Sequence, residues 1–508
     1  MRPRPVAPFE ATPVGDGIEL RLPHGDRYPG ERRFGRRSRT LMTPSLSETE
    51  TRTEDRATER RTHHEFNGNG DATLLRPEAH VWDATVCVVG LGYVGLPLAV
   101  RFAQSAYRVI GYDVDESKVD TLNDGVDTTG DLSDDDILDG EITYTTDATA
   151  IRDATHVVIA VPTPIDDDER PNLEYVESAG ATVGANMAPE TTVILESTVY
   201  PGATREVLVP ALEDASGLSA GEDFFVGYSP ERATPGDDEH GLEDVVKVVS
   251  GQTEEVLEEV ATLYESVVDA GVHRAPSIEV AEASKVVENS QRDLNIAFVN
   301  ELSVAFDRMG VDTQAVLEAA STKWNFHGYR PGLVGGHCIP VDPYFLAYRS
   351  GREGFTPELT RTSREVNESV PAHVATLTIK ALNECHKAPR GSRVLVLGLA
   401  YKPGVGDIRS SKVADVVEEL QEFDVEIEGY DPFTDDEAVR ESFALTVQES
   451  LSFEGFDAIL LATPHAEFEH LDLEAVADDL AADPALIDVT GALEEEEATE
   501  AGFVYRTL

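Results

Sequence analysis

The sequence TVCVVGLGYVGLPLAVRFAQ, residues 85–104, decides the fold of this chain. A valine-rich run leads into the motif Gly90-x-Gly92-x-x-Gly95, and apolar residues then recur at helical spacing. This order predicts a buried strand, a tight turn and an amphipathic helix. A second apolar run, YRVIGYDVD, places Asp113 23 residues after Gly90. Strand, glycines, helix and acid together predict a dinucleotide-binding Rossmann unit.

The same residues indicate which dinucleotide binds. Glycines let the backbone approach a pyrophosphate at the start of the helix, where N–H groups and the helix dipole favour anions. Asp113 would accept hydrogen bonds from ribose hydroxyls and repel a 2′-phosphate, so we expect NAD rather than NADP. A Rossmann-like unit without a cofactor is the alternative, and the agreement of all four features argues against it.

Further apolar runs extend this unit, with helical stretches between most of them, at residues 155–164, 191–198, 224–232 and 245–251. The alternation predicts a doubly wound α/β domain, whose ligands bind beyond the carboxyl ends of the strands. Polar segments stand at three of those ends: Pro162-Thr163-Pro164, Ser197-Thr198 and Ser229-Pro230-Glu231-Arg232. Each alone fits turn or capping chemistry, but three at one sheet edge favour a site.

Residues 277–309 form a helical pattern without glycine or proline. Lys285, Asn289 and Arg292 follow one another at spacings of four and three residues, so they share one face of that helix. A polar stripe usually faces solvent, but a lysine and an asparagine placed before a reactive loop favour a functional role. We expect the helix to join two domains and to form the contact of a homodimer or higher homo-oligomer.

A loop rich in glycine and proline follows at residues 329–345, YRPGLVGGHCIPVDPYF, and its composition excludes helix and strand. It carries Cys338 after paired glycines and Asp342 four residues later. Paired glycines allow a ligand to approach the backbone, and an accessible thiol suits a nucleophile. A buried, inert cysteine in a tight turn is the alternative.

A second α/β unit begins at Ser392 with RVLVLGLAYKPGVGD and continues through the apolar runs EIEGYDPF, DAILLATPH and ALIDVTG. Its first turn lacks the GxGxxG motif, so the unit is expected to be Rossmann-like but to bind a different ligand. Lys402 and Arg409 are the charged groups in this turn that are available to a phosphate. The alternative is two solvated surface charges.

The length of 508 residues is enough for two to four domains. The net charge is −55, spread from about residue 110 onward, which repels nucleic acid and anionic membranes. We interpret this acidic excess as the mark of a cytoplasmic protein from a halophile, with a haloarchaeon-like source. A disordered acidic chain is excluded because 41% of residues are hydrophobic and periodic. Three scattered cysteines give no disulfide framework or metal site, and no apolar run reaches the roughly 18 residues of a spanning helix.

Residues 1–80 lack this periodicity and are expected to be a disordered extension. Nine arginines and five acids give residues 1–41 a net charge of +4, which leaves −59 for the remainder. The run RRFGRRSR is followed by no apolar region, so an export signal is rejected. A basic arm for nucleic acid is a weak alternative, and translation starting at Met42 would remove it.

From residue 85 to about 505 the chain resembles the UDP-glucose/GDP-mannose dehydrogenase family of nucleotide-sugar 6-dehydrogenases. The motifs that carry the resemblance are GLGYVGLPLA, VPTP, ESTVYPG, SPER, EASKVVENSQRDLNIAFVNEL, GGHCIPVDPYFL and GLAYKPGVGDIRSS. The resemblance implies two Rossmann-like doubly wound domains joined by a long central helix. We accordingly expect the extension at 1–80, an NAD-binding domain at 81–275, a central helical domain with the cysteine loop at 276–388 and a UDP-sugar-binding domain at 389–508.

The resemblance also implies an NAD-dependent, four-electron oxidation of a sugar. The C6 alcohol loses a hydride and becomes an aldehyde, to which the thiolate of Cys338 adds. A second hydride leaves, and water hydrolyses the resulting thioester to the uronic acid. The matching Lys285 and Asn289 are implied to stabilise the oxyanion.

The remaining roles are implied by the same match. Asp342, Glu231 and Thr198 correspond to positions that handle the water and its protons. The cofactor-binding set is Gly90, Gly92, Tyr93, Val94, Gly95, Asp113, Lys118, Thr163, Thr198 and Arg409. The substrate-binding set is Glu231, Arg232, Lys285, Asn289, Arg292, Tyr329, Gly335 and Lys402.

One loop residue favours a branch of the family. Val341 stands before Asp342, where UDP-glucose enzymes typically carry a lysine, and TKWNFHGYRPGLV upstream is similar to the UDP-N-acetylhexosamine branch. We therefore expect UDP-N-acetyl-D-glucosamine as substrate. UDP-glucose, UDP-N-acetyl-D-mannosamine and GDP-mannose stay alternatives. A catalytically silent protein that binds NAD and a nucleotide sugar is a further alternative. The presence of all four residues Cys338, Lys285, Asn289 and Asp342 argues against it.

The charge generates a prediction about salt. The Debye length falls from roughly 30 Å at 0.01 M ionic strength to about 3 Å at 1 M, so repulsion among carboxylates is largely screened in molar salt. We expect both the melting temperature and the turnover rate to rise between dilute buffer and molar KCl. A thermal melt and a rate series measure this, and a protein most stable in dilute buffer would contradict the halophile interpretation.

Overall fold

The computed structural model describes residues 84–129, 132–133, 136–137, 142–166, 168–233 and 241–508. The expected extension at 1–80 and the start at Met42 lie outside these ranges. Within them, no helix is both long and apolar enough to cross a membrane.

The first sheet has the strand order β3-β2-β1-β4-β5-β6-β7-β8. Its strands are β1 (Thr85–Val89), β2 (Arg108–Tyr112), β3 (Ile142–Thr145), β4 (His156–Ile159), β5 (Thr192–Leu195), β6 (Phe225–Tyr228), β7 (Lys247–Gly251) and β8 (Val272–Arg274). Neighbouring strands are parallel except for β6 and β7. The order from β3 to β6 is that of a doubly wound nucleotide-binding sheet, so the predicted fold is confirmed.

The side chains of β1 point alternately into two apolar cores, one on each face of this sheet, and helices cover both faces. Cys87 and Val89 belong to one apolar core, which also contains side chains of α4 (Glu174–Asn186) and α5 (Val209–Ser216). Val86 and Val88 belong to the opposite core, with α1 (Gly95–Gln104) and α6 (Glu254–Glu265). Because successive side chains of a strand point to opposite faces, a continuous apolar run is required for such a central strand.

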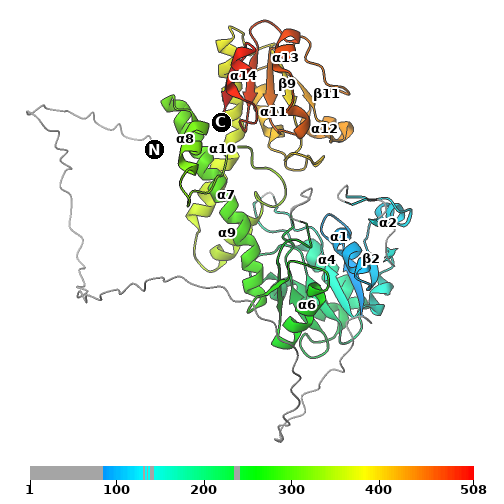
Figure 1. The fold of residues 1–508 in the computed structure, drawn as a ribbon. Coiled ribbons are helices and arrows are strands. Elements are labelled where there is room, and N and C mark those ends of the chain that lie inside the picture. Colours follow the sequence, from blue (N-terminus) through cyan, green and yellow to red (C-terminus); the bar gives the residue numbers. More distant parts are fainter. Residues whose placement is uncertain (1–83, 130–131, 134–135, 138–141, 167, 234–240) are drawn as a thin grey trace, which may run out of the picture. The chain divides into compact units, whose positions relative to one another are not determined.

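The second sheet is entirely parallel, with the order β11-β10-β9-β12-β13-β14. Its strands are β9 (Arg393–Leu397), β10 (Glu426–Tyr430), β11 (Thr446–Val447), β12 (Ala458–Leu461), β13 (Ala485–Asp488) and β14 (Val504–Thr507). Its helices are α11 (Val413–Gln421), α12 (Asp436–Phe443), α13 (Leu473–Asp479) and α14 (Glu495–Glu500). Figure 1 shows these helices around the strands, which confirms the second Rossmann-like unit.

The predicted central helix is α7 (Ile278–Met309). The Ser277 side chain caps the first turn of α7 by accepting from the Val280 N–H. The helix is terminated by Gly310, whose φ of +67° favours glycine. A second long helix, α10 (Glu358–Glu384), lies beside it (Figure 1). The sequence did not single out α10, because Pro371 lies inside it and proline normally signals a helix boundary.

The loop interpretation of residues 329–345 was wrong at its end. Helix α9 (Asp342–Arg352) begins at Asp342, with Pro343 in its first turn. Proline is compatible with that position because the first helical N–H groups have no partner within the helix. Asp342 is therefore held by a helix and not by a flexible loop.

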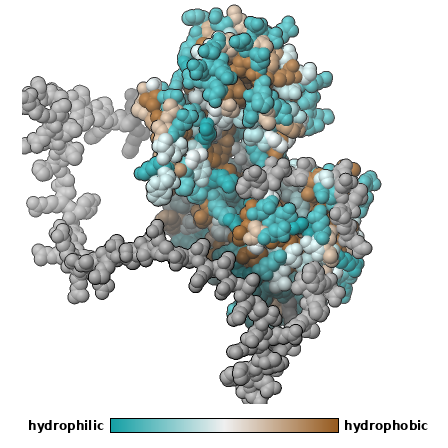
Figure 2. Space-filling view, viewed as in Figure 1, coloured by the Kyte–Doolittle hydropathy of each residue, from teal (hydrophilic) through white to brown (hydrophobic). Residues whose placement is uncertain are grey.

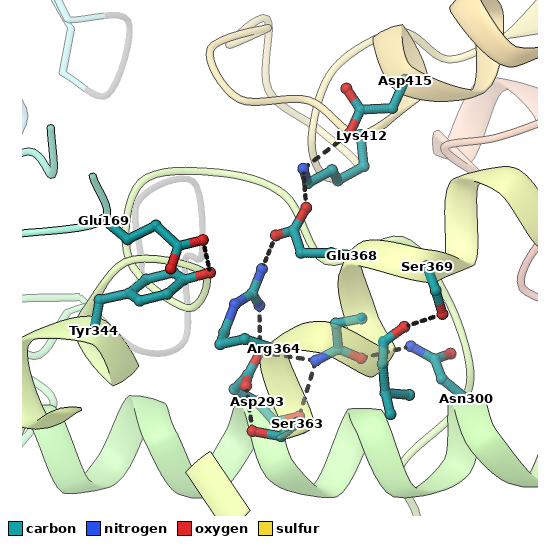
Figure 3. A network of polar contacts seen from close by, with 12 residues as sticks. Glu169, Asp293, Asn300, Tyr344, Ser363, Arg364, Glu368, Ser369, Lys412 and Asp415 are labelled. Carbon is teal, nitrogen blue, oxygen red and sulfur yellow. Dashed lines mark hydrogen bonds and ion pairs between the residues drawn. The ribbon is translucent and has the colours of Figure 1, made fainter. Parts of the chain in front are cut away.

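A buried ionic cluster joins α7 to α10 (Figure 3). The Arg364 guanidinium is 2% exposed and donates from Nη1 to Asp293 Oδ1 at 2.5 Å. Ser363 Oγ donates to the other oxygen of Asp293 at 2.9 Å, and Asn367 Nδ2 donates to Oδ1 at 2.8 Å. Arg364 also pairs with Glu368, which in turn pairs with Lys412 before α11. Asp293 and Arg364 are both buried and paired with each other, so removing one partner is expected to be costly.

We expect Asp293→Asn to lower stability by about 3 kcal/mol, because it leaves Arg364 buried with half of its compensating charge. Asp436→Asn is the matched control, since it breaks the exposed pair with Arg440 and should cost under about 1 kcal/mol. Thermal melts of both variants measure the difference. Equal melting temperatures would show that the buried cluster does not hold the two helices together.

Candidate active site

The glycine turn after β1 has two crowded positions and one open one. Gly90 has a φ of +94°, and a Cβ there would lie 2.5 Å from the Ala160 carbonyl oxygen. A Cβ at Gly95 would lie 1.8 Å from the Gly90 carbonyl oxygen. A Cβ at Gly92 would meet nothing within 4 Å. Packing thus requires the outer glycines, and the middle one leaves the open space that a pyrophosphate needs.

Asp113 lies directly after β2 and faces this turn. Its Oδ2 accepts from the Leu91 N–H at 2.8 Å and from Lys118 Nζ at 2.8 Å, and its Oδ1 accepts from the Asp115 N–H. Burial opposes ionisation of Asp113, but Lys118 and these N–H donors hold its pKa below the usual value. An ionised acceptor at this strand end is what the ribose of NAD requires.

The other expected cofactor residues lie around the same edge. Val94 stands directly before α1, and its side chain makes no cap hydrogen bond. Tyr93 is 37% exposed, and the Arg409 guanidinium lies 5.2 Å from its ring centroid. Arg409 is also held by Asp407, through Nε to Oδ1 at 2.9 Å and Nη2 to Oδ2 at 2.6 Å. Thr163 and Thr198 are half-buried beyond the ends of β4 and β5. The ends of β1, β2, β4 and β5, the helix α2 (Glu116–Asn123) and the loop after β9 therefore supply the residues of the cofactor set.

The cysteine loop packs against the loop that follows β9. A Cβ at Gly335 would lie 2.7 Å from the Ser410 carbonyl oxygen, and one at Gly336 would lie 2.7 Å from the Tyr401 ring. The Gly336 N–H donates to Ser410 O at 3.2 Å. The paired glycines are therefore needed for contact between two protein loops, and this differs from the ligand approach that the sequence suggested.

Cys338 is exposed, whereas Cys87 and Cys385 are buried. The Asp342 N–H donates to the Cys338 carbonyl oxygen at 3.0 Å, so the thiol lies one turn before α9. Its neighbour His337 places Nδ1 3.8 Å from Sγ. An accessible sulfur at the start of a helix excludes the interpretation of an inert core cysteine.

Asp342 is buried against α7. Asn289 Nδ2 donates to Asp342 Oδ2 at 2.6 Å. Burial raises the pKa of Asp342 to about 6, against the opposing effects of Lys285 and of the Asn289 hydrogen bond. The spacing that places Lys285 and Asn289 on one helix face thus brings both to the acid that follows the cysteine.

Charges around the thiol compete. Cys338 is exposed, but the protein around its sulfur displaces water, and this desolvation raises the pKa of the thiol to about 11. Asp342 raises that pKa further, whereas Lys285, Lys402 and Arg292 lower it. The resting thiol is therefore protonated at neutral pH. The structure brings the expected lysines and arginine close enough to act on this one sulfur, although they come from α7 and from the loop after β9.

Glu231 belongs to a buried polar group that the sequence only partly indicated. Its Oε2 accepts from Lys247 Nζ at 2.7 Å, and its Oε1 accepts from the Arg232 and Ala233 N–H groups. Lys247 also pairs with Glu196, whose Oε2 accepts from Tyr264 Oη at 2.6 Å.

Burial opposes ionisation of both acids, with different results. Lys247 lowers the pKa of Glu231, whereas burial raises the pKa of Glu196 to about 7. Lys247 and Glu196 were missed, although a lysine inside the apolar run VVKVVSG was the available signal.

Two expected substrate residues engage α7. Arg232 forms an ion pair with Glu288, with Nη2 2.8 Å from Oε1. Gln291 Nε2 lies 3.4 Å from Tyr329 Oη, a long hydrogen bond. Arg292 is exposed on the same helix.

Three consecutive parts of the chain match one family. Residues 84–268 match the NAD binding domain of the UDP-glucose/GDP-mannose dehydrogenase family, residues 279–369 its central domain and residues 395–495 its UDP binding domain. The chain is 42% identical over 417 residues to the UDP-N-acetyl-D-glucosamine 6-dehydrogenase of Pseudomonas aeruginosa, covering 82% of this chain and 99% of that protein. It is 46% identical over 383 residues to protein CapL of Staphylococcus aureus, covering 75% and 90%.

The fold also resembles a solved structure. A UDP-D-ManNAc dehydrogenase from Pyrococcus horikoshii superposes with a TM-score of 0.75 at 32% identity, covering 83% of this chain and 98% of that one.

We expect iodoacetamide at pH 8 to label Cys338 slowly, because most of the thiol is protonated and the thiolate is the nucleophile. Asp342→Asn should speed labelling and Lys285→Met should slow it, with the thiolate fraction changing about tenfold per unit of pKa. Mass spectrometry measures the rate, and Cys338→Ser is the control that should remain unlabelled. An unchanged rate in Asp342→Asn would show that its carboxylate does not act on the thiol.

Proposed function

Because the chain belongs to the UDP-glucose/GDP-mannose dehydrogenase family, we propose that it oxidises the C6 alcohol of UDP-N-acetyl-D-glucosamine to the uronic acid. The observation that carries the reaction is the exposed Cys338 thiol among Asp342, Lys285 and Asn289. The similarity to the Pseudomonas aeruginosa enzyme over 99% of its length supports the N-acetylglucosamine sugar. Val341 supports the same branch, since it leaves the position before Asp342 without a cation.

The first domain fits NAD. Gly92 faces open space at the turn, and Asp113 is an ionised acceptor beside it. NAD, when bound there, accepts one hydride in each of two oxidations. The protein's part is to hold the sugar's C6 near the nicotinamide and to retain the aldehyde between the two transfers.

Cys338 retains the aldehyde covalently. Its sulfur bonds to C6 while its proton leaves, and the aldehyde oxygen becomes an alkoxide or hydroxyl. The Lys285 ammonium and the Asn289 amide are placed to stabilise that oxygen. Loss of the second hydride gives the thioester, whose hydrolysis releases the uronate and returns the thiol.

Asp342 is the proposed proton acceptor for these steps. Its pKa of about 6 lies close to neutrality, where a general base combines a large ionised fraction with appreciable basicity. Glu231, held ionised by Lys247, would be the second acid of the site. Thr198, three residues after the end of β5, would assist in handling the water. Lys402 would bind the substrate's diphosphate, and its charge already acts on Cys338.

A UDP-N-acetyl-D-mannosamine dehydrogenase is the second candidate, favoured by the similarity to the Pyrococcus horikoshii structure. The two sugars differ only in configuration at C2, so the same cysteine chemistry serves both. UDP-glucose is less favoured, because Val341 replaces the lysine typical of that branch.

The setting of the enzyme is also a proposal. The acidic excess and a mostly hydrophilic face (Figure 2) support a halophilic, cytoplasmic protein that binds neither nucleic acid nor membrane. Exposed apolar side chains along α7 support a homo-oligomer contact through that helix: Val280, Val287, Phe298 and Met309.

The test is the NADH yield per sugar with UDP-N-acetyl-D-glucosamine, UDP-N-acetyl-D-mannosamine, UDP-glucose and GDP-mannose. We expect two NADH per UDP-N-acetyl-D-glucosamine and the highest kcat/KM for that sugar. Cys338→Ser should lose uronate formation by at least about a hundredfold while still binding NAD, and Cys385→Ser should keep it. Full turnover by Cys338→Ser would exclude the thioester route, and no NADH from any sugar would favour a silent binding protein.

A further inference from the structure

The second sheet repeats the local geometry of the NAD turn. Gly398 follows β9 with a φ of +79°, as Gly90 follows β1 with a φ of +94°. The Gly398 N–H donates to Tyr430 O at 2.9 Å, and the Gly90 N–H donates to Tyr112 O at 2.8 Å. A Cβ at Gly398 would lie 2.1 Å from the carbonyl oxygen of Thr463, the counterpart of the contact made at Gly90.

The acid after the second strand is repeated as well. Asp431 Oδ2 accepts from the Leu399 N–H at 2.7 Å, as Asp113 Oδ2 accepts from the Leu91 N–H at 2.8 Å. The partners then differ. Asp113 is met by Lys118, whose side chain is 28% exposed, whereas Asp431 is met by the fully buried His465.

His465 fills the place beside this second acid. Its Nε2 lies 3.0 Å from Asp431 Oδ2, and its Nδ1 accepts from the Gly404 N–H at 3.0 Å. Because Nδ1 is an acceptor, the ring proton is on Nε2 and is donated to Asp431. The imidazole also packs between Phe433 and Phe468, with centroids 4.9 and 5.7 Å away. Both nitrogens are satisfied and the ring is fixed.

The segment that His465 holds replaces the phosphate turn. In the first domain α1 begins at Gly95, five residues after its turn glycine, but α11 begins at Val413, fifteen residues after Gly398. The added loop carries Lys402 and Tyr401, and Tyr401 contacts Gly336 beside the cysteine. Holding Gly404 therefore orders a loop that reaches the Cys338 site.

We propose that His465 is a positioning residue for the nucleotide sugar. Its Nε2 takes on Asp431 Oδ2 the place that Lys118 Nζ takes on Asp113 Oδ2, and its Nδ1 fixes Gly404 so that the loop presents Lys402 to a nucleoside diphosphate. The second domain thus keeps the strand, turn and acid of the first, with a buried imidazole in place of the partly exposed lysine. The identity of the ligand rests on the proposed function, and the role of His465 is tested separately from it.

The test compares four variants by calorimetric titration with UDP and by steady-state kinetics. His465→Leu removes both hydrogen bonds and should weaken UDP binding and raise the KM for the UDP-sugar at least tenfold, with kcat and the KM for NAD within about twofold. His465→Asn places an acceptor near Nδ1 and should recover most of the affinity. His465→Gln reaches Asp431 only and should stay weak. His470→Gln, exposed five residues later, is the control.

The outcomes separate the two proposals. Wild-type protein that binds no UDP would contradict the proposed function. UDP affinity in the wild type with equal affinity in His465→Asn and His465→Gln would overturn the positioning role alone. If His465→Leu does not fold, the comparison of the other two still decides, because each keeps one polar contact. A loss of kcat and of NAD affinity together in His465→Leu would indicate a structural role only.

Discussion

The hydrogen bond of 2.6 Å between Asn289 and Asp342 is the interaction on which the site depends. It fixes the first turn of α9 against α7, and Cys338 lies one turn before that point. It also explains why a carboxylate can be buried there at all, since a buried acid without a donor would be far more costly. Desolvation is the main cause of the raised pKa of the Cys338 thiol, and the Asp342 carboxyl raises that pKa further. The hydrogen bond therefore positions both the thiol and one of the groups that act on its pKa.

The chain has few cations for its many acids, and the buried lysine and arginine in its described part are paired. Lys247 is paired with two acids of the candidate site, and Arg364 is paired with two acids where α7 and α10 meet. Around Cys338 the balance is reversed, because Lys285, Lys402 and Arg292 act on it against Asp342. A diphosphate substrate approaching a protein of net charge −55 thus meets its attractive field only at short range.

Periodicity and residue spacing predicted the features that depend on residues close together in the chain. The strand, turn and helix at 85–104, the limits of α7 and the shared face of Lys285 and Asn289 follow from periodicity and spacing. The features that the sequence did not predict depend on contacts between residues far apart in the chain. Pro371 is tolerated inside α10, and the paired glycines at 335 and 336 are set by Tyr401 and Ser410. His465 gave no signal, because its partners lie 34 and 61 residues away.

The protonated state of the Cys338 thiol has a consequence for the lifetime of the enzyme. Oxidants such as peroxide react with thiolates, so an exposed cysteine with a pKa of about 11 is converted slowly to sulfenic acid. An equally exposed cysteine with an ordinary thiol pKa would be oxidised faster, because more of it would be thiolate. In the proposed mechanism the proton of this sulfur is removed by a base when a carbonyl is bound, so an exposed thiol would stay slow to oxidise between turnovers.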